Sequence, residues 1–194
     1  MNKIIGVTGP SGAGKGLFCT YLADLGCTVI DSDKIAHSVT KKGSKCLADL
    51  VKAFGPEILA KGGRLNRRKL ASIAFSDPKK TQTLNQITHP AILEIINDKI
   101  KKAQSTVALD APLLYEGGLD KICDAVAVID ADEETRLSRI MARDHMTREA
   151  ALTRLKAKKP LEPADKKRYY SYNASKEQLR EFAREVFESV TRLK

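Results

Sequence analysis

The residues with the clearest chemistry form the stretch Gly9–Gly16, which reads GPSGAGKG. It fits the spacing GxxxxGK, in which glycines let successive backbone N–H groups face a phosphate. The stretch follows an apolar, strand-like run and opens an amphipathic helical pattern, the context that phosphate binding at a helix N-terminus requires. The pattern therefore predicts a phosphate-binding loop in which Lys15 reaches the β- and γ-phosphates of a nucleotide.

Gly16 departs from this pattern, because Ser or Thr usually stands there and holds magnesium. Magnesium keeps several waters and takes only one or two protein ligands besides phosphate oxygens. A water could therefore fill the position, with Asp31, Asp33 or Asp110 holding the ion through its shell. Two interpretations stay open: a working enzyme with weakened metal binding, and a nucleotide-binding fold that has lost its chemistry.

The elements that must position this loop alternate between strand-like and helix-like patterns, which favours an α/β fold with a parallel sheet. The strand-like runs are short and apolar or β-branched, as expected for strands buried on both faces. Five such runs are predicted, at residues 3–8, 28–30, 106–109, 125–129 and 169–172.

Polar residues follow these runs, and ligands of open parallel sheets bind at the carboxyl ends of the strands. Asp31, Asp110 and Asn173 each follow a run, as Gly9 follows the first. We expect Asp31 and Asp110 to face a site at this edge. For Asp130 we favour a structural role, because the stretch DADEE at 130–134 is typical of a helix start.

Two segments break the plain alternation. Residues 35–102 are helical in pattern and too long for one crossover helix, so they predict an inserted subdomain. Residues 147–167 are basic, with Thr147 as a helix N-cap and Pro160 and Pro163 ending the helix. Near the end of the chain, Ser175 and Gln178 form a capping-box pattern.

The net charge of +10 implies an anionic partner, unless it serves solubility alone. The chain shows neither interleaved aromatic residues nor a groove-reading motif, which argues against nucleic acid. No apolar run approaches the roughly 20 residues that span a membrane. A phosphorylated small molecule remains. The four scattered cysteines lack metal-ligand spacing and suit a reducing compartment.

Taken together in order, several motifs resemble the dephospho-coenzyme A kinases over residues 3–190. The motifs beside the loop are VIDSDKIAH at 29–37, GRLNRRKL at 63–70, ITHP at 87–90, LDAPLLYEGGLD at 109–120, RIMARD at 139–144 and YNAS at 172–175. The resemblance implies a three-layer P-loop kinase fold with a five-stranded parallel sheet. It implies one domain, 1–194, whose core is 1–34, 103–138 and 168–194. A helical coenzyme A-binding region would span 35–102, and a lid 139–167.

The activity implied is transfer of the γ-phosphoryl of ATP, with Mg²⁺, to the 3′-hydroxyl of dephospho-coenzyme A. The alternative, motivated by Gly16, is a weakened or silent nucleotide- or coenzyme A-binding protein. The implied partners are small molecules, without nucleic acid or membrane, in a cytoplasmic protein that is a monomer or a weak homo-oligomer.

Site residues carried over from the resemblance fall into four groups. The catalytic group is Asp33 as general base, with Lys15 and Arg139. The ATP-binding group is Gly9, Pro10, Ser11, Gly12, Ala13, Gly14, Lys15, Gly16, Leu17, Arg139, Arg143 and Asn173. The acceptor-binding group is Asp33, Arg67, His89, Leu113 and Glu116. The metal group is Asp110, directly or through water.

Simpler interpretations of these residues stay open. Asp33 could cap the next helix, and His89 could precede a helix that Pro90 begins. Asn173 could contact adenine or only turn the chain. Arg139 and Arg143 share a helix face and could clamp a γ-phosphoryl group or form surface ion pairs. The sequence also departs from the family at Lys158, where Gln is common.

Overall fold

The computed structural model describes residues 2–156, 168–173 and 175–192. The chain divides into two compact units. The first, which we call the sheet unit, comprises Met1–Asp31 and Ala103–Lys194; the second, the helical unit, comprises Ser32–Lys102. Among the helices of the described ranges, none is both long and apolar enough to cross a bilayer.

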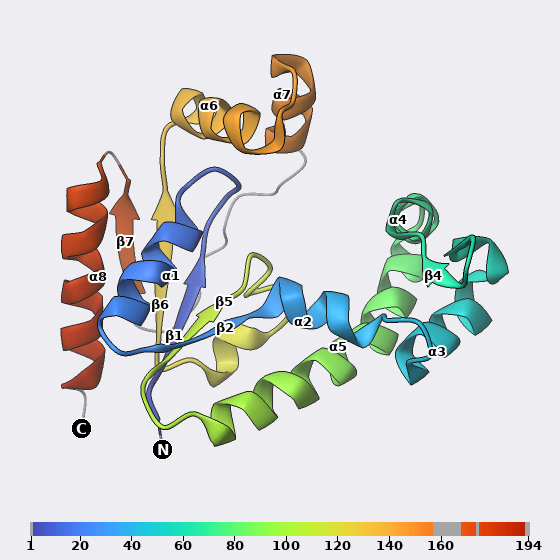
Figure 1. The fold of residues 1–194 in the computed structure, drawn as a ribbon, viewed down its shortest axis with the longest axis horizontal. Helices are drawn as coiled ribbons and strands as arrows, with labels where there is room; N and C mark the ends of the chain where they lie inside the picture. Colours follow the sequence, from blue (N-terminus) through green and yellow to red (C-terminus); the bar gives the residue numbers. More distant parts are fainter. Residues whose placement is uncertain (1, 157–167, 174, 193–194) are drawn as a thin grey trace. The chain divides into compact units, whose positions relative to one another are not determined.

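The sheet unit is built on five parallel strands in the order β2-β5-β1-β6-β7 (Figure 1). All five predicted strands are confirmed, to within a single residue at each end, and so is the α/β class. The central strands β1, β5 and β6 form because their apolar residues are buried on both faces, whereas the edge strands expose Val29 of β2 and Tyr170 and Tyr172 of β7. Their bounds are β1 Ile4–Thr8, β2 Thr28–Asp31, β5 Val107–Asp110, β6 Ala125–Asp130 and β7 Arg168–Tyr172.

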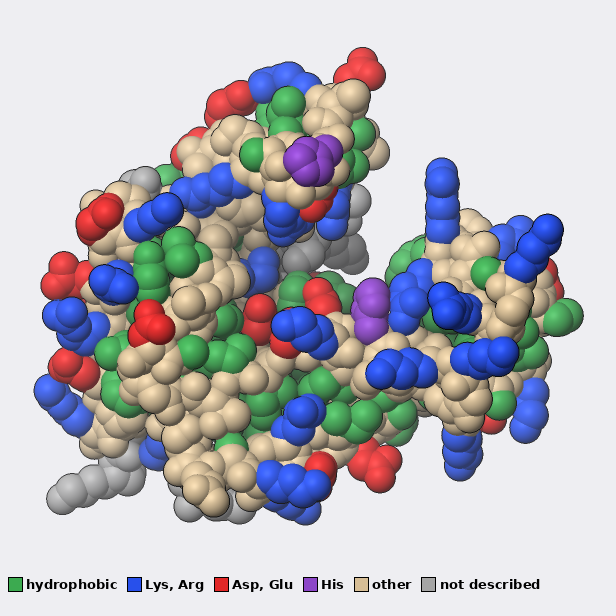
Figure 2. Space-filling model, viewed as in Figure 1, with side chains coloured by type: hydrophobic (Ala, Val, Ile, Leu, Met, Phe, Trp, Pro, Cys, Tyr) green, Lys and Arg blue, Asp and Glu red, His purple; other side chains and the backbone are tan. Residues whose placement is uncertain are grey.

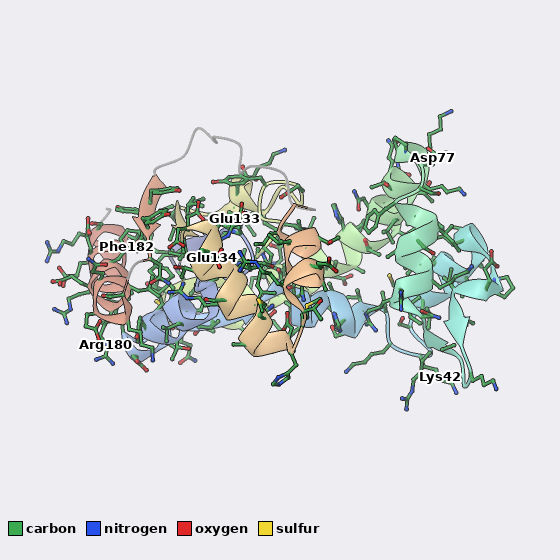
Figure 3. The ribbon with its side chains drawn as sticks, turned by 90° about the horizontal axis from the view of Figure 1, so that it is seen from above. Lys42, Asp77, Glu133, Glu134, Arg180 and Phe182 are labelled. Carbon is green, nitrogen blue, oxygen red and sulfur yellow. The ribbon has the colours of Figure 1, made fainter. Side chains whose placement is uncertain are left out.

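Two helices pack against one face of this sheet. Figure 1 shows α1 (Lys15–Asp24) and α8 (Lys176–Thr191) side by side there. The ring of Phe182 in α8, which is labelled in Figure 3, lies with its centroid 5.4 Å from that of Phe18 in α1. Ser175 caps α8 by accepting a hydrogen bond from the Gln178 N–H at 3.2 Å, which confirms half of the predicted capping box. This packing holds the start of α1 over the sheet.

The opposite face of β1 meets the segment that follows β5. A Cβ on Gly6 would lie 2.8 Å from the Cys123 Sγ and 3.1 Å from the Leu114 side chain, so both residues press on the strand. The segment includes the 3₁₀ helix η2 (Leu119–Ile122), and Leu114 is fully buried. Leu114 is thus a core residue.

The helices α6 (Glu133–Asp144) and α7 (Arg148–Lys156) share a small apolar cluster of Leu137, Ile140, Ala151 and Leu155. The predicted helix start is confirmed, since the Asp132 carboxylate accepts the Thr135 N–H at 2.7 Å. Glu133 and Glu134, labelled in Figure 3, occupy the first turn, where negative charge complements the helix dipole.

The predicted cap at Thr147 is also present, because its hydroxyl accepts the Ala150 N–H at 3.4 Å. Pro160, Pro163 and Lys158 lie outside the described residues.

The helical unit contains a small antiparallel pair of strands that its sequence does not predict. Each strand has only two residues, too few for alternation to show. Side-chain caps are clear: Ser44 accepts the Leu47 N–H at 3.1 Å, and Asn66 accepts the Lys69 N–H at 3.0 Å. The elements are α2 Ser32–Val39, α3 Lys45–Phe54, η1 Pro56–Ile58, β3 Leu59–Ala60, β4 Arg64–Leu65, α4 Arg67–Ala74 and α5 Pro78–Lys102.

Pro90 lies inside the 25-residue helix α5, so the interpretation that it begins a helix is wrong. Proline removes one helical hydrogen bond and strains the preceding turn. The helix continues through it because α5 packs against α2, α3 and α4, which together outweigh this cost. Its core contact is Ile96, which is fully buried.

Candidate active site

The phosphate-binding loop connects β1 to α1. Its shape depends on glycines with positive φ, among them Gly12 at 81°. Gly14 precedes α1 and provides no side-chain cap, and no acidic residue lies in the first turn. The first N–H groups of the helix are therefore available to an anion, and the helix dipole favours one.

Lys15 is the first residue of α1, and its ammonium group lies over the loop. The Nζ donates to the carbonyl oxygens of Gly9 at 2.8 Å and Pro10 at 3.0 Å. Neutral carbonyls are weaker acceptors than charged phosphate oxygens. The lysine is thus held at the loop by contacts that an anion can replace.

Gly16 lies in the first turn of α1 and faces open space. A Cβ built there would meet no heavy atom within 4 Å, and the backbone does not adopt a positive φ. A serine would therefore fit without strain. The missing hydroxyl changes the potential metal ligands but leaves the shape of the loop unchanged.

Two carboxylates end neighbouring strands beside this loop. Asp31 of β2 and Asp110 of β5 are register partners, and Asp110 in turn pairs with Val7 of β1. Burial raises the pKa of the Cys19 thiol far above its usual value; the charge of Asp110 raises it further, Lys15 lowers it and Asp31 raises it. The two acids and the lysine thus converge around one buried point of α1.

This arrangement suits a hard cation held mainly by phosphate and water. Oxygen donors are the ligands that magnesium prefers. In the described part of the chain, no group of three or more His, Cys, Asp or Glu residues is placed to hold a metal alone. The donor set fits magnesium arriving with a nucleotide better than a resident metal.

Arginines of α6 lie on the other side of the loop. The Arg139 Nη1 donates to the carbonyls of Gly12 at 3.3 Å and Ala13 at 3.4 Å. Arg143 points to a different partner: its Nε and Nη2 each contact the Asp144 carboxylate at 2.8 Å. The structure therefore brings Arg139 to the phosphate loop and gives Arg143 an ion pair.

Asn173 follows β7 and holds the phosphate loop by a side-chain hydrogen bond. Its side chain is 4% exposed, and its Nδ2 donates to the Ala13 carbonyl at 2.8 Å. Its own N–H donates to the Asp130 carbonyl at 2.7 Å. Asn173 thus holds the loop to the ends of β6 and β7; the predicted contact with ATP remains a prediction.

The segment after β5 carries two predicted acceptor residues. Leu113 is 55% exposed, unlike the buried Leu114, and Glu116 is exposed. The Thr8 hydroxyl donates to the Pro112 carbonyl at 3.5 Å, which links this segment to the end of β1. Both predicted residues are accessible to a ligand near the strand ends.

Three further predicted residues belong to the helical unit. Asp33 is exposed and lies inside the first turn of α2, not at its cap, so the capping interpretation is wrong. The Arg67 Nη2 donates to the His37 carbonyl at 3.2 Å and the Thr40 hydroxyl at 3.0 Å. His89 is half-buried in α5. Their binding roles remain predictions.

Arg136 lies beside the phosphate loop and was not among the predicted site residues. A Cβ on Gly12 would lie 2.6 Å from the Arg136 carbonyl oxygen, so α6 rests directly on the loop at this turn. The sequence feature that could have identified Arg136 is its spacing of three residues from Arg139, which places both on one helix face.

Comparison with known proteins gives one consistent family. The family model for dephospho-CoA kinase matches residues 3–171. The dephospho-CoA kinase of Syntrophotalea carbinolica is 40% identical over 163 residues, covering 82% of this chain and 77% of that protein. The dephospho-CoA kinase of Listeria innocua is 36% identical over 171 residues, covering 86% of each.

Solved structures agree with the sequence comparisons. The crystal structure of TT1252 from Thermus thermophilus is 27% identical, with a TM-score of 0.79, and the match covers 100% of this chain and 98% of that one. The dephospho-CoA kinase from Campylobacter jejuni is 26% identical, with a TM-score of 0.64, and the match covers 98% of each chain.

Proposed function

The chain belongs to the dephospho-CoA kinase family, and from that premise we propose how its residues carry the reaction. The protein is an ATP-dependent kinase that phosphorylates dephospho-CoA. The transfer goes to the 3′-hydroxyl of the acceptor's ribose. The products are coenzyme A, ADP and a proton.

The phosphates of ATP bind in the loop Gly9–Gly16. Main-chain N–H groups at the start of α1 donate to the phosphate oxygens. Lys15 and Arg139 exchange the loop carbonyls that they contact for charged oxygens, which are stronger acceptors. These cations stabilise the charge that spreads over the γ-phosphoryl oxygens during transfer.

Asp33 takes the proton of the acceptor hydroxyl. The oxygen then forms a bond to the γ-phosphorus as the bond from that phosphorus to the β,γ-bridging oxygen breaks, and ADP leaves. Asp33 suits this role because it is exposed and lies two residues after Asp31, the last residue of β2. Arg67, His89, Leu113 and Glu116 contribute to acceptor binding.

Asp110 and Asp31 would hold magnesium, directly or through water, and the ion would supply positive charge that neutralises the phosphates. Gly16 offers no hydroxyl, so this chain holds the ion with one protein ligand fewer. We expect weaker magnesium binding but retained turnover.

The observation that carries this proposal is the intact loop around Gly16. Lys15, Arg139 and Asn173 all contact the loop carbonyls, and a side chain at position 16 would meet nothing within 4 Å. The substitution therefore removes one hydroxyl and leaves the phosphate cradle intact. A silent nucleotide-binding protein would need a further defect, and the described residues of the loop show none.

The test is a coupled ADP-release assay with dephospho-CoA and titrated magnesium, run on this protein and on Gly16→Ser. Mass spectrometry of the product should show one added phosphate. We expect turnover in both, with the serine variant reaching half-maximal rate at lower magnesium.

Other outcomes distinguish the alternatives. Turnover in Gly16→Ser alone would show that this chain is a silent member of the family. Inactivity of both proteins, with folded cores and bound ADP, would overturn the proposed function.

We also propose a cytoplasmic location. All four cysteines are free and buried, and burial raises the pKa of the Cys27 thiol to about 11, so this thiol stays protonated at neutral pH. Free thiols of this kind persist in a reducing compartment. A monomer or weak homo-oligomer remains the expectation.

A further inference from the structure

The backbone of Arg136 in α6 packs closely against Gly12 of the phosphate loop. A Cβ on Gly12 would lie 2.6 Å from its carbonyl oxygen and 2.9 Å from its Cα. It precedes Arg139 by three residues, so both side chains leave the same face of α6. Since Arg139 contacts the carbonyls of Gly12 and Ala13, that face is turned toward the loop.

The guanidinium of Arg136 has few partners for its degree of burial. Its side chain is 17% exposed, and it can donate five hydrogen bonds. Its contact with the Asp130 Oδ1 is 3.5 Å, at the outer limit of a hydrogen bond. Within the described residues, its buried Nε has no hydrogen-bond partner.

Asp130 does not compensate for this deficit. One carboxylate oxygen accepts the Ala131 N–H at 2.8 Å, and the other accepts the Tyr170 hydroxyl at 3.1 Å. The carboxylate is thus anchored mainly by these two shorter bonds. The ion pair with Asp130 is long and leaves the buried Nε without a hydrogen bond, and a buried donor without an acceptor is costly.

Arg143 shows the opposite situation on the same helix. Its side chain is 57% exposed, and two of its nitrogens contact Asp144 at 2.8 Å each. Asp144 also accepts from the Arg154 Nη1 at 2.6 Å. Arg136, unlike Arg143, therefore keeps spare donors beside the loop.

We propose that Arg136 is a further nucleotide-binding residue, which donates to an anionic oxygen of the donor nucleotide's phosphates beside Gly12. It acts alongside Lys15 and Arg139. This inference rests on the proposed function only for the identity of the nucleotide. A charged oxygen gives the guanidinium the strong acceptor that Asp130 supplies weakly.

The test measures binding of ADP and of inorganic tripolyphosphate by calorimetry, with magnesium and without acceptor. The variants are Arg136→Gln and Arg136→Lys, with Arg184→Gln, an exposed arginine of α8, as the charge-matched control. We expect Arg136→Gln to weaken both ligands about 10- to 100-fold, the range for a hydrogen bond to a charged group. The lysine variant should recover part of this, and the control should stay within about twofold of the wild type.

A structural role through Asp130 gives a different pattern, which Asp130→Asn reveals. If Arg136 only supports Asp130, the asparagine variant weakens ADP binding as much as Arg136→Gln, and the double variant adds nothing. That result overturns the proposal, as does unchanged ADP binding in a folded Arg136→Gln protein. Loss of ADP binding with retained tripolyphosphate binding overturns the phosphate contact.

Two further controls keep the test decisive. If Arg136→Gln does not fold, Arg136→Lys carries the comparison, because it keeps the charge and loses the forked geometry. Wild-type protein that binds ADP but does not phosphorylate dephospho-CoA would contradict the proposed function and leave this inference standing.

Discussion

The two units of this protein divide its charge unequally. The helical unit, Ser32–Lys102, has 15 Lys and Arg against six Asp and Glu, a net charge of +9. The sheet unit has 19 against 18, a net charge of +1. Figure 2 shows, on the face drawn, many Lys and Arg side chains over the helical unit and few Asp or Glu. The positive charge excess is therefore concentrated in the helical unit.

The ion pairs of the two units also differ in kind. In the sheet unit several ion pairs join different segments, as in Arg148–Glu134 at 2.6 Å and Lys3–Asp124 at 3.3 Å, while Arg192–Glu188 connects neighbouring turns at the end of the chain's last helix. In the helical unit, Lys52–Asp49 and Lys102–Asp98 lie within single helices. Paired charges between elements fix geometry, whereas unneutralised surface cations create a long-range field that attracts anions.

The two units thus differ in how their cations can act on an anion, by direct contact in one and by long-range attraction in the other. The sheet unit places a few cations on the phosphate loop at hydrogen-bond distance. The helical unit carries most of the net positive charge, +9, and such a charge attracts anions over a longer range. It also contributes the predicted base, Asp33.

The largest effect is expected at Asp33. We expect Asp33→Asn to lower kcat about 10²- to 10⁴-fold, the usual contribution of general-base catalysis, with ADP affinity unchanged. Steady-state kinetics and calorimetry measure the two quantities. Glu94→Gln, an exposed site on α5, is the control. A variant that loses ADP affinity as strongly as kcat would contradict the division of tasks.

A second change compares two glycines with similar φ. Gly12 has φ 81°, and its Cβ would lie 2.6 Å from backbone, whereas Gly43 of the helical unit has φ 85° and open space. We expect Gly12→Ala to cost about 2–5 kcal/mol, from left-handed strain and overpacking. Gly43→Ala should cost about 1–2 kcal/mol from strain alone. Urea unfolding measures both; equal costs would show that α6 does not rest on the loop.

A smaller effect is expected from salt, which should raise the KM values for the two substrates to different extents. Raising ionic strength from about 0.05 M to about 0.5 M shortens the screening length from roughly 14 Å to about 4 Å. We expect the KM for dephospho-CoA to rise severalfold and the KM for ATP to rise less, because the loop contacts are short-range and partly buried. Sucrose at equal osmolality is the control. A larger rise for ATP would assign the attraction to the sheet unit instead.

The smallest effect concerns the link between α6 and α7. Hydrogen bonds from Arg143 lower the pKa of Asp144 in the folded protein, with smaller contributions from Arg154 and His145. A carboxyl group whose pKa is lower in the folded state stabilises the fold at pH values above its unfolded-state pKa, which is about 3.9. This stabilisation is lost as the pH falls through the lower pKa of the folded state. Asp144→Asn should therefore melt slightly below wild type at pH 7, with the difference vanishing below about pH 4. A difference that grows in acid would contradict the pairing.

Much of the fold could be predicted because its signals are local. The runs around Val7, Ala108 and Ala127 are apolar enough to be strands in any parallel sheet, and Asp132 and Ser175 precede their helices with a cap's chemistry. The two-residue strands β3 and β4 could not be predicted, because pairing across a turn defines them. Pro90 misled for the same reason: only packing holds α5 through it.

The phosphate-binding loop, the polar ends of the strands beside it and the missing hydroxyl at Gly16 follow from the sequence alone, because they depend on residue type and spacing. Only the tertiary structure decided which side chains share the site. It brings Arg139 and Asn173 to Ala13 from positions 126 and 160 residues away, and it pairs Arg143 with its neighbour. Helical spacing treats the arginines of α6 alike, whereas the packing of that helix on Gly12 distinguishes them.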